Sequence, residues 1–290
     1  MFSGTATALI TPFLKDGSVD EKTLRRIVDF QEENGVDALV PCGSTGESAT
    51  LSHDEHIDVI KIVVDQARKA KVIAGAGSNS THEAIVLSRR AQDAGADGIL
   101  SISPYYNKPT QEGIYQHYKT ISESIDIPLV LYNVPGRTGS NIAAETTLRL
   151  AKLPGVAAIK EASGSIDQIQ TILASRPKDF LVLSGDDGLT FPMMALGCDG
   201  TISVASNCFP KEVSEMIRLC RSGMYSEARG IHMRMLPLFS ALFIESNPIP
   251  INYIMKKAGF GTGTVRLPLT ELTPASAAAV DAVLKDMRRK

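Results

Sequence analysis

The chain has 290 residues, of which 43% are hydrophobic and 21% are charged, and its formal net charge is −2. This composition excludes an intrinsically disordered chain, and the near balance of charge argues against a nucleic-acid or anionic-membrane surface. No apolar run approaches the roughly 20 residues that a membrane span requires, so we expect neither a nucleic-acid nor a membrane partner.

The cysteines carry no sign of a disulfide framework or a zinc site. Cys42, Cys198, Cys208 and Cys220 form no CxxC pair and lack zinc-ligand spacing. Reduced, buried thiols fit the cytosol, and the N-terminus lacks a basic region followed by an apolar run. The sequence therefore predicts a cytoplasmic protein without a secretion signal.

Short apolar runs alternate with longer amphipathic stretches along the first 205 residues. Their spacing of roughly 20–35 residues is typical of βα units. The runs are Ala6–Thr11, Ala38–Cys42, Val72–Ala76, Gly98–Ile102, Pro128–Tyr132, Val156–Lys160, Phe180–Ser184 and Gly200–Val204. Eight such units predict a (β/α)8 barrel. A doubly wound open sheet is the alternative, but it needs a glycine-rich phosphate turn, which Thr11–Leu14 does not supply.

Helix signals lie between the predicted strands. Leu24, Ile27 and Val28 share one helical face ahead of Gly35, which predicts the end of the helix there. Two later stretches begin with the spacing of a capping box, Ser52 with Glu55 and Ser80 with Glu83.

A weak internal repeat also supports the barrel. The tripeptides Gly35–Asp37, Gly95–Asp97 and Gly197–Asp199 each precede an apolar run. Glycine suits the left-handed residue after a helix, so each tripeptide predicts a turn from a helix into the next strand.

The pattern changes after about residue 205, where helical periodicity continues without a convincing strand. The helical stretches are Pro210–Gly223, Met224–Phe243, Asn247–Ala258 and Pro274–Arg289. We predict a catalytic barrel over residues 1–223 and a C-terminal helical domain over residues 224–290.

Lys160 follows four consecutive apolar residues, Val156–Ile159, a pattern typical of a strand that is covered on both faces. Burial without a partner disfavours the ammonium form and exposes a neutral amine, which is what a Schiff-base nucleophile needs. Considered alone, Lys160 also fits an ordinary strand-end lysine that snorkels to solvent or pairs with a carboxylate.

The ends of the other predicted strands are polar, and in (β/α)8 enzymes the chemistry lies at these ends. They carry Gly43–Ser48, Ser103–Asn107, Tyr132–Arg137 and Ser184–Asp187. Arginine can grip a carboxylate with two hydrogen bonds, and hydroxyls flanked by glycine can bind the same group.

Each of these features also has an ordinary structural interpretation. Gly43–Ser48 fits a capped loop, Tyr132 a packed strand aromatic and Arg137 a solvated loop charge. Asp186 and Asp187 are better explained as caps of the following helix than as an acid–base pair. The histidines of His53–His56 stand three apart and do not form HExxH, so we expect no metal site.

Taken together, these residues resemble the dihydrodipicolinate synthase branch of the pyruvate-dependent class I aldolase superfamily, which also contains N-acetylneuraminate lyase. The similarity covers essentially the whole chain. The motifs that carry it are GSTGES (Gly43–Ser48), PYYN (Pro104–Asn107), YNVPGRTG (Tyr132–Gly139), IKEA (Ile159–Ala162), SGDD (Ser184–Asp187) and NPIP (Asn247–Pro250).

The resemblance implies a role for each matching residue. Lys160 would form the Schiff base with pyruvate. Tyr132, Ser44 and Tyr106 would relay protons, with Tyr106 reaching into the site of a partner subunit. Further positions would bind substrate: Thr45 the pyruvate carboxylate, Arg137 the carboxylate of L-aspartate 4-semialdehyde, and Gly185 and Ile202 through main-chain contacts near Lys160.

One residue departs from the usual GTTGES motif of this branch, because Ser44 stands where threonine is usual. Serine at this place is found in the neuraminate-lyase branch, so Ser44 does not decide between the branches. Arg137 within GRTG resembles the synthase, since the lyase has an apolar residue there.

The resemblance also implies an effector site for L-lysine at a tight dimer interface. The matching positions are Ser48, Ala49, His53, His56, Asn79, Glu83 and Tyr105. Glu83 can pair with an ammonium, and a helix N-terminus can receive a carboxylate. Because adjacent strand residues point to opposite sides, Tyr105 could face this cleft while Tyr106 enters an active site. Ordinary polar interface residues are the alternative.

The predicted activity is thus the condensation of pyruvate with L-aspartate 4-semialdehyde in the diaminopimelate route of lysine biosynthesis, without metal or organic cofactor. The resemblance also implies a homotetramer and inhibition by lysine. A sugar-acid aldolase of the same superfamily and a catalytically silent barrel that serves as a sensor or scaffold are the alternative functions.

Overall fold

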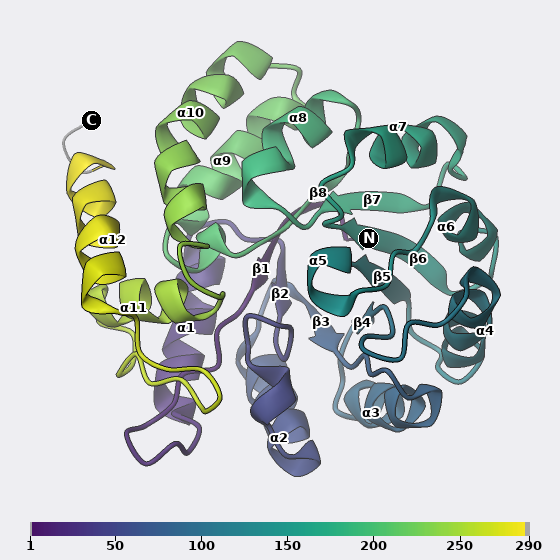
Figure 1. Ribbon diagram of the computed structural model, residues 1–290, viewed down its shortest axis with the longest axis horizontal. Helices are drawn as coiled ribbons and strands as arrows, with labels where there is room; N and C mark the ends of the chain where they lie inside the picture. The colour runs from purple at the N-terminus through teal and green to yellow at the C-terminus, as the bar shows by residue number, and fades with distance from the viewer. Residues whose placement is uncertain (1, 288–290) are drawn as a thin grey trace.

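The computed structural model describes residues 2–287, and its strands form a closed parallel barrel (Figure 1). Each strand pairs with the next along the chain, and β1 pairs with β8. The strands are β1 (Gly4–Ala8), β2 (Ala38–Val40), β3 (Lys71–Gly75), β4 (Gly98–Ile102), β5 (Leu129–Asn133), β6 (Val156–Glu161), β7 (Leu181–Ser184) and β8 (Gly200–Ser203). This topology confirms the (β/α)8 barrel and excludes the doubly wound sheet.

All eight strands lie on the predicted apolar runs, with small shifts at their ends. The largest shift is in β1, which begins at Gly4 and not at Ala6, because Gly4 pairs with Gly200 where the barrel closes. A Cβ atom on Gly200 would lie 2.1 Å from the carbonyl oxygen of Gly4. Glycine at position 200 therefore permits the closing contact.

Helices follow the strands and cover the outside of the barrel (Figure 1). Their bounds are α1 (Glu21–Glu33), α2 (His53–Gln66), α3 (Thr81–Asp93), α4 (Gln111–Ser122), α5 (Pro135–Thr138), α6 (Ala144–Leu150), α7 (Ile166–Ser175), α8 (Thr190–Ala195) and α9 (Pro210–Arg221). The apolar face of α1 is fully buried, as predicted.

One of the two predicted capping boxes is complete. The Ser52 hydroxyl accepts from the Glu55 amide, and the Glu55 carboxylate accepts from the Ser52 amide. At the start of α3, Ser80 accepts from the Glu83 amide, but the reciprocal bond is missing. The prediction was wrong in this half, because the Glu83 carboxylate instead contacts Ser78 and His53.

The Gly-x-Asp repeat has a structural role at each of its three positions. Gly35, Gly95 and Gly197 have positive φ angles of 81°, 92° and 102°, as the predicted turns require. The carboxylates that follow them accept from strand amides: Asp37 from Thr5, Asp97 from Val72 and Asp199 from Val182. Each aspartate thus fastens the beginning of one strand to the neighbouring strand.

The C-terminal region is helical, as predicted. It contains α10 (Tyr225–Ala241), α11 (Ile249–Lys257) and α12 (Pro274–Met287), and α10 packs against both α9 and α12. The predicted end of the last helix beyond residue 287 lies outside the described residues. The boundary between residues 223 and 224 stays a prediction. Within residues 2–287, no helix is both long and apolar enough to cross a membrane.

Residues 258–273 connect α11 to α12, and we call this segment the strap. In Figure 1 the strap is yellow-green and runs back across the chain toward α1 and α2. Thr264 forms an antiparallel bridge with Phe13, and the Thr262 hydroxyl donates to the Phe13 carbonyl at 2.7 Å. The strap therefore packs against the loop that follows β1.

Candidate active site

Strand β6 directs Lys160 into the barrel. Along its end, Ala158 belongs to the core inside the barrel, whereas Ile159 packs in the layer between strands and helices. The pairing with β5 passes from Val156 directly to Ala158, so Ala157 is an extra residue in a bulge. Because side chains alternate beyond the bulge, Lys160 points inward with Ala158.

Inside the barrel, Lys160 is 5% exposed and pairs in register with Tyr132 of β5. Its Nζ atom lies 4.2 Å from the centre of the Tyr132 ring. Within residues 2–287, no ion pair joins Lys160 to a carboxylate. The neighbouring Glu161 points outward and accepts from Asn133, Ser163 and Gln168. Within the described residues, Lys160 is therefore neither a snorkelling lysine nor half of a salt bridge.

Gly185 leaves the space that the Lys160 side chain occupies. A Cβ atom at position 185 would lie 3.0 Å from the Cε atom of Lys160 and 2.8 Å from the Cβ atom of Ala162. The Gly185 amide donates to the Glu161 carbonyl at 2.8 Å, which keeps the two strand ends together. Ile202 of β8 is 1% exposed and belongs to the core inside the barrel.

Ser44 and Tyr132 meet at a small cavity of about 30 Å³ near the ends of β2 to β5. Ser44 also lines a larger hollow of about 460 Å³, so it connects the surface with the space beside Tyr132. Thr45 is 3% exposed, and its hydroxyl accepts from the Asn247 amide at 3.0 Å. The Gly43–Ser48 loop is thus more than a capped turn, because it forms part of the wall of the hollow.

Arg137 stands at the opening of the same hollow, on α5. It is exposed, and its Nη2 atom donates to the carbonyl oxygen of Asn247 at 3.0 Å. No carboxylate within residues 2–287 forms an ion pair with Arg137. Such a group at the mouth of a pocket can hold an anionic substrate.

Tyr105 and Tyr106 do not alternate on a strand, so that prediction was wrong. Strand β4 ends at Ile102, and the two tyrosines lie in the turn that follows, with Tyr106 at a φ angle of 72°. Tyr106 is 88% exposed and points away from the chain that carries it, whereas Tyr105 lines the large hollow. The turn, not strand alternation, separates their directions.

The residues expected to bind an effector lie together on one side of the large hollow. All of them except Asn79 line it. Asn79 donates to the Tyr105 carbonyl at 3.1 Å, and His53 contacts Glu83 at 2.9 Å. The bond from Ser78 holds the pKa of the Glu83 carboxyl below its usual range, while burial lowers the pKa of His56. Glu83 therefore carries a negative charge that can bind a cation.

Asp186 has the capping role expected of it, whereas Asp187 has a different structural role. Asp186 caps the 3-10 turn Asp187–Leu189 by accepting from the Gly188 amide, and Asp187 accepts from the amides of Val204 and Ala205 beyond β8. Burial raises the pKa of the Asp187 carboxyl. Within residues 2–287, no ion pair joins either aspartate to Lys160, and no group of three or more potential ligands could hold a metal ion.

A buried lysine that faces the inside of a (β/α)8 barrel, beside a tyrosine, is typical of the class of enzymes that form a Schiff base with a carbonyl substrate. The particular family follows from comparison with known proteins. The chain belongs to the dihydrodipicolinate synthetase family, whose sequence model matches residues 1–287.

Individual relatives agree over nearly their full lengths. A 4-hydroxy-tetrahydrodipicolinate synthase of Chloroherpeton thalassium is 54% identical over 97% of this chain and 94% of its own. The structure of the chloride-inhibited dihydrodipicolinate synthase of Acinetobacter baumannii with pyruvate is 42% identical, with a TM-score of 0.97 over 99% of both chains. The lysine-bound enzyme of Cyanidioschyzon merolae is 41% identical, with a TM-score of 0.96 over 99% and 98%.

Sequence reasoning noticed the motif Asn247–Pro250 but gave Asn247 no role. In the structure, Asn247 contacts both Thr45 and Arg137, and so joins two substrate-binding candidates. Glu47, inside GSTGES, was likewise given no role, although it is 4% exposed. The sequence did contain a signal for Glu47, because it is the one carboxylate in a loop whose other polar side chains are hydroxyls.

Proposed function

We propose that this chain condenses pyruvate with L-aspartate 4-semialdehyde, which is the reaction of a 4-hydroxy-tetrahydrodipicolinate synthase. The observation that carries the proposal is Lys160 itself: it is buried inside the barrel, lies 4.2 Å from the Tyr132 ring, and has no ion-pair partner within residues 2–287. A buried amine that is not tied to a carboxylate can add to the carbonyl carbon of a substrate.

In the proposed reaction, the amine of Lys160 adds to the ketone carbon of pyruvate, and loss of water gives an imine. Removal of a proton from the methyl group gives an enamine, whose carbon attacks the aldehyde of the second substrate. The amine of that substrate then attacks the imine carbon, closes the ring and releases Lys160. The barrel contributes position and proton transfer, and no cofactor takes part.

The proton transfers are assigned to Tyr132, Ser44 and Tyr106. Tyr132 and Ser44 line the same cavity, which supports a shared role. Tyr106 is 88% exposed on its own chain, which supports the proposal that it completes the site of a partner subunit. We therefore propose that the active unit is a dimer, assembled in pairs as a homotetramer.

Arg137 supports the synthase over a sugar-acid lyase. Its guanidinium is exposed at the hollow and has no carboxylate partner within residues 2–287, so it suits the carboxylate of aspartate semialdehyde, while Thr45 suits that of pyruvate. A sugar-acid aldolase would use the same Lys160 chemistry without needing this cation. Direct comparison of turnover on the two kinds of substrate decides between them, and turnover of any pyruvate-derived substrate rejects a silent scaffold.

Borohydride trapping tests the nucleophile. With pyruvate, the wild-type chain should gain a stable adduct on Lys160, and Lys160→Ala should gain none and lose activity. Lys152→Ala, which changes a lysine outside the barrel interior, is the control and should trap normally. A folded wild-type chain without an adduct would sink the mechanism.

Mixing two inactive variants tests the shared site. In a heterodimer of Lys160→Ala and Tyr106→Phe chains, one site combines an intact Lys160 with an intact Tyr106. We expect activity to reappear after the two variants are unfolded and refolded together, and light scattering should report a tetramer. Full activity of Tyr106→Phe alone would reject its role in the relay.

We further propose that the protein is cytoplasmic, as its four free cysteines suggest. The first of two proposals on ligands and location is that L-lysine inhibits the enzyme by binding in the hollow beside Glu83. The lysine-bound relative from Cyanidioschyzon merolae supports the first proposal. Initial rates with and without millimolar L-lysine test it, and unchanged rates would remove the assignment.

A further inference from the structure

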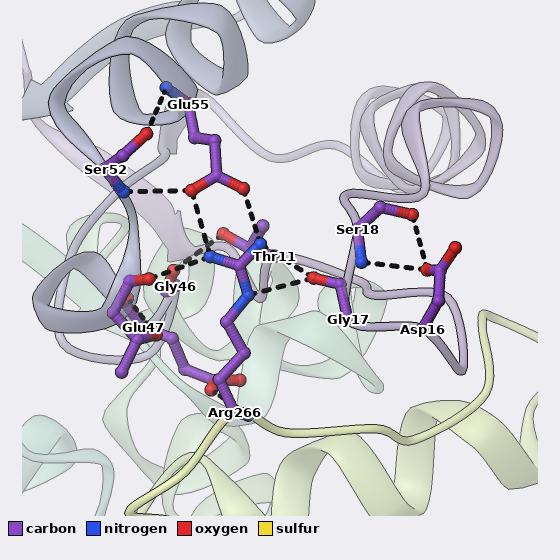
Figure 2. A network of polar contacts seen from close by, with 10 residues as sticks. Thr11, Asp16, Gly17, Ser18, Gly46, Glu47, Ser52, Glu55 and Arg266 are labelled. Atoms are coloured by element: carbon purple, nitrogen blue, oxygen red, sulfur yellow. Dashed lines mark hydrogen bonds and ion pairs between the residues drawn. The ribbon is translucent and has the colours of Figure 1, made fainter.

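Arg266, in the strap, is the centre of a polar network that reaches the Gly43–Ser48 loop (Figure 2). Its guanidinium is shared among two backbone carbonyls and one carboxylate. Nε donates to the carbonyl of Gly17 at 2.9 Å, and Nη1 donates to that of Thr50 at 2.8 Å. Nη2 donates to the Glu55 carboxylate at 2.5 Å, and Nη1 donates to its other oxygen at 3.1 Å.

These contacts join three separate parts of the chain. Gly17 lies in the loop between β1 and α1, Thr50 follows the Gly43–Ser48 loop, and Glu55 lies in the first turn of α2. The guanidinium also stacks on the Phe13 ring, 4.4 Å from its centre. Only a planar group with several fixed N–H bonds can meet all of these acceptors at once, so lysine is not an equivalent residue here.

The backbone of Arg266 makes the contact nearest to the active site. Its amide donates to the Glu47 Oε2 atom at 2.9 Å. Glu47 is 4% exposed and adopts a φ angle of 54°, in the left-handed region that is unfavourable for a residue with a side chain. Such a conformation persists where surrounding contacts fix it, and the bond from Arg266 is one of these contacts.

Two further contacts hold the same loop. The Thr11 hydroxyl donates to the Gly46 carbonyl at 2.7 Å, and the Asn247 amide donates to the Thr45 hydroxyl at 3.0 Å. Three consecutive loop residues, Thr45 to Glu47, are therefore each held by a hydrogen bond from elsewhere in the chain. Two of the donors, Asn247 and Arg266, lie beyond α10. Ser44 lies next to these anchors and lines the hollow together with strap residues Pro268 and Leu269.

We infer that Arg266 is a positioning residue: it fastens the strap to the Gly43–Ser48 loop and thereby fixes the positions of the Ser44 and Thr45 hydroxyls. The inference rests on the proposed function for its catalytic consequence. Arg266 does not itself line the hollow, so it acts through Glu47 and the Thr50 backbone. Small displacements of such hydroxyls cost large factors in rate.

The test compares Arg266→Met with Arg176→Met. Arg176 is a matched control, because it also pairs with a half-buried carboxylate, Asp199, and donates to the carbonyls of Phe180 and Gly197, away from the active-site loop. At a temperature where all variants are folded, Arg266→Met should lower kcat/KM for pyruvate by about 10- to 100-fold, and Arg176→Met should stay within about twofold. Arg266→Lys should fall between Arg266→Met and wild type.

Hydrogen exchange of peptides covering residues 43–51 gives a readout that needs no activity. Exchange there should accelerate in Arg266→Met and not in Arg176→Met. Faster exchange with unchanged kinetics would overturn the catalytic role, and unchanged exchange in a folded variant would overturn the positioning role altogether. The two proposals can fail separately. If the wild type gives neither turnover nor a borohydride adduct, the proposed function is rejected. Faster exchange in Arg266→Met would then still support the fastening of the loop by Arg266.

Discussion

Glu47→Gln probes the unusual carboxyl group of the active-site loop. Burial raises the pKa of Glu47 from 4.5 to about 7, and the bond from the Arg266 amide offsets only part of this effect. Its Oε1 atom has no hydrogen-bond partner among the described residues. A glutamine keeps the acceptor for Arg266 but cannot ionise, so the variant removes the energetic cost of the buried charge.

The sign follows from the direction of the pKa shift. The unfolded chain loses this proton near pH 4.5 and the folded chain near pH 7, so wild type loses stability relative to the variant as the pH rises through that range. At about 1.4 kcal/mol per pKa unit, the relative loss between pH 5 and pH 8 amounts to roughly 2–3 kcal/mol. The different packing of glutamine adds a constant that does not depend on pH and cancels from this difference.

Urea unfolding at fixed protein concentration, at pH 5 and pH 8, measures the effect. The free energy of unfolding of Glu47→Gln relative to wild type should rise by about 2–3 kcal/mol between the two pH values. Glu55→Gln is the control in the same network, because the bond from Arg266 lowers the pKa of Glu55 to about 2 and its titration lies below pH 5. An equal difference between wild type and Glu47→Gln at both pH values would refute the reasoning.

Two substitutions test the walls of the site. Gly185→Ala places a methyl group 3.0 Å from the Cε atom of Lys160, so it should lower kcat and the rate of borohydride trapping by about 100-fold. Gly136→Ala is the control and should behave as wild type, because its added Cβ atom meets no atom within 4 Å. Normal trapping in Gly185→Ala would contradict the steric explanation. Glu83→Gln keeps the contacts with Ser78 and His53 but removes the negative charge. The L-lysine concentration that gives half inhibition should therefore rise about tenfold or more. An unchanged concentration would exclude Glu83 from the effector site.

The barrel was predictable because its signals are local. Apolar runs mark the strands, and the glycines of the Gly-x-Asp repeat mark the turns that lead into them. The structure adds the reason for the aspartates: Asp37, Asp97 and Asp199 each accept from an amide at the beginning of the neighbouring strand. A short repeat therefore encodes both the turn and the sideways pairing of strands.

Lys160 was identifiable for the same reason, since a charged residue interrupts an apolar run. The periodicity did not predict that Ala157 forms a bulge, and this bulge is what keeps Val156 in the outer layer while Lys160 faces the interior. The directions of Tyr105 and Tyr106 were assigned from strand alternation, and that reasoning failed because β4 ends at Ile102. Strand ends are the places where alternation stops being informative.

The contacts of Asn247 and Arg266 could not be found from local patterns. Asn247 meets a residue 202 positions earlier, and the Arg266 amide meets one 219 positions earlier. Such pairs leave no periodic signal, because only the closed barrel brings the two segments together. A motif such as NPIP can show that a segment matters, but its partners come from the fold.

These long-range contacts change the meaning of the C-terminal region. A division between residues 223 and 224 describes a change of secondary structure, from alternating strands and helices to helices alone. It does not separate catalysis from the remainder, because Asn247 holds Thr45 and Arg137, and the strap holds Glu47. A barrel that ended at residue 223 would retain Lys160 and Tyr132 but would leave the Thr45 hydroxyl and the Glu47 carboxyl without these donors. The loop that carries the Ser44 and Thr45 hydroxyls would then lack two of its three anchors and keep only the bond from Thr11 to Gly46.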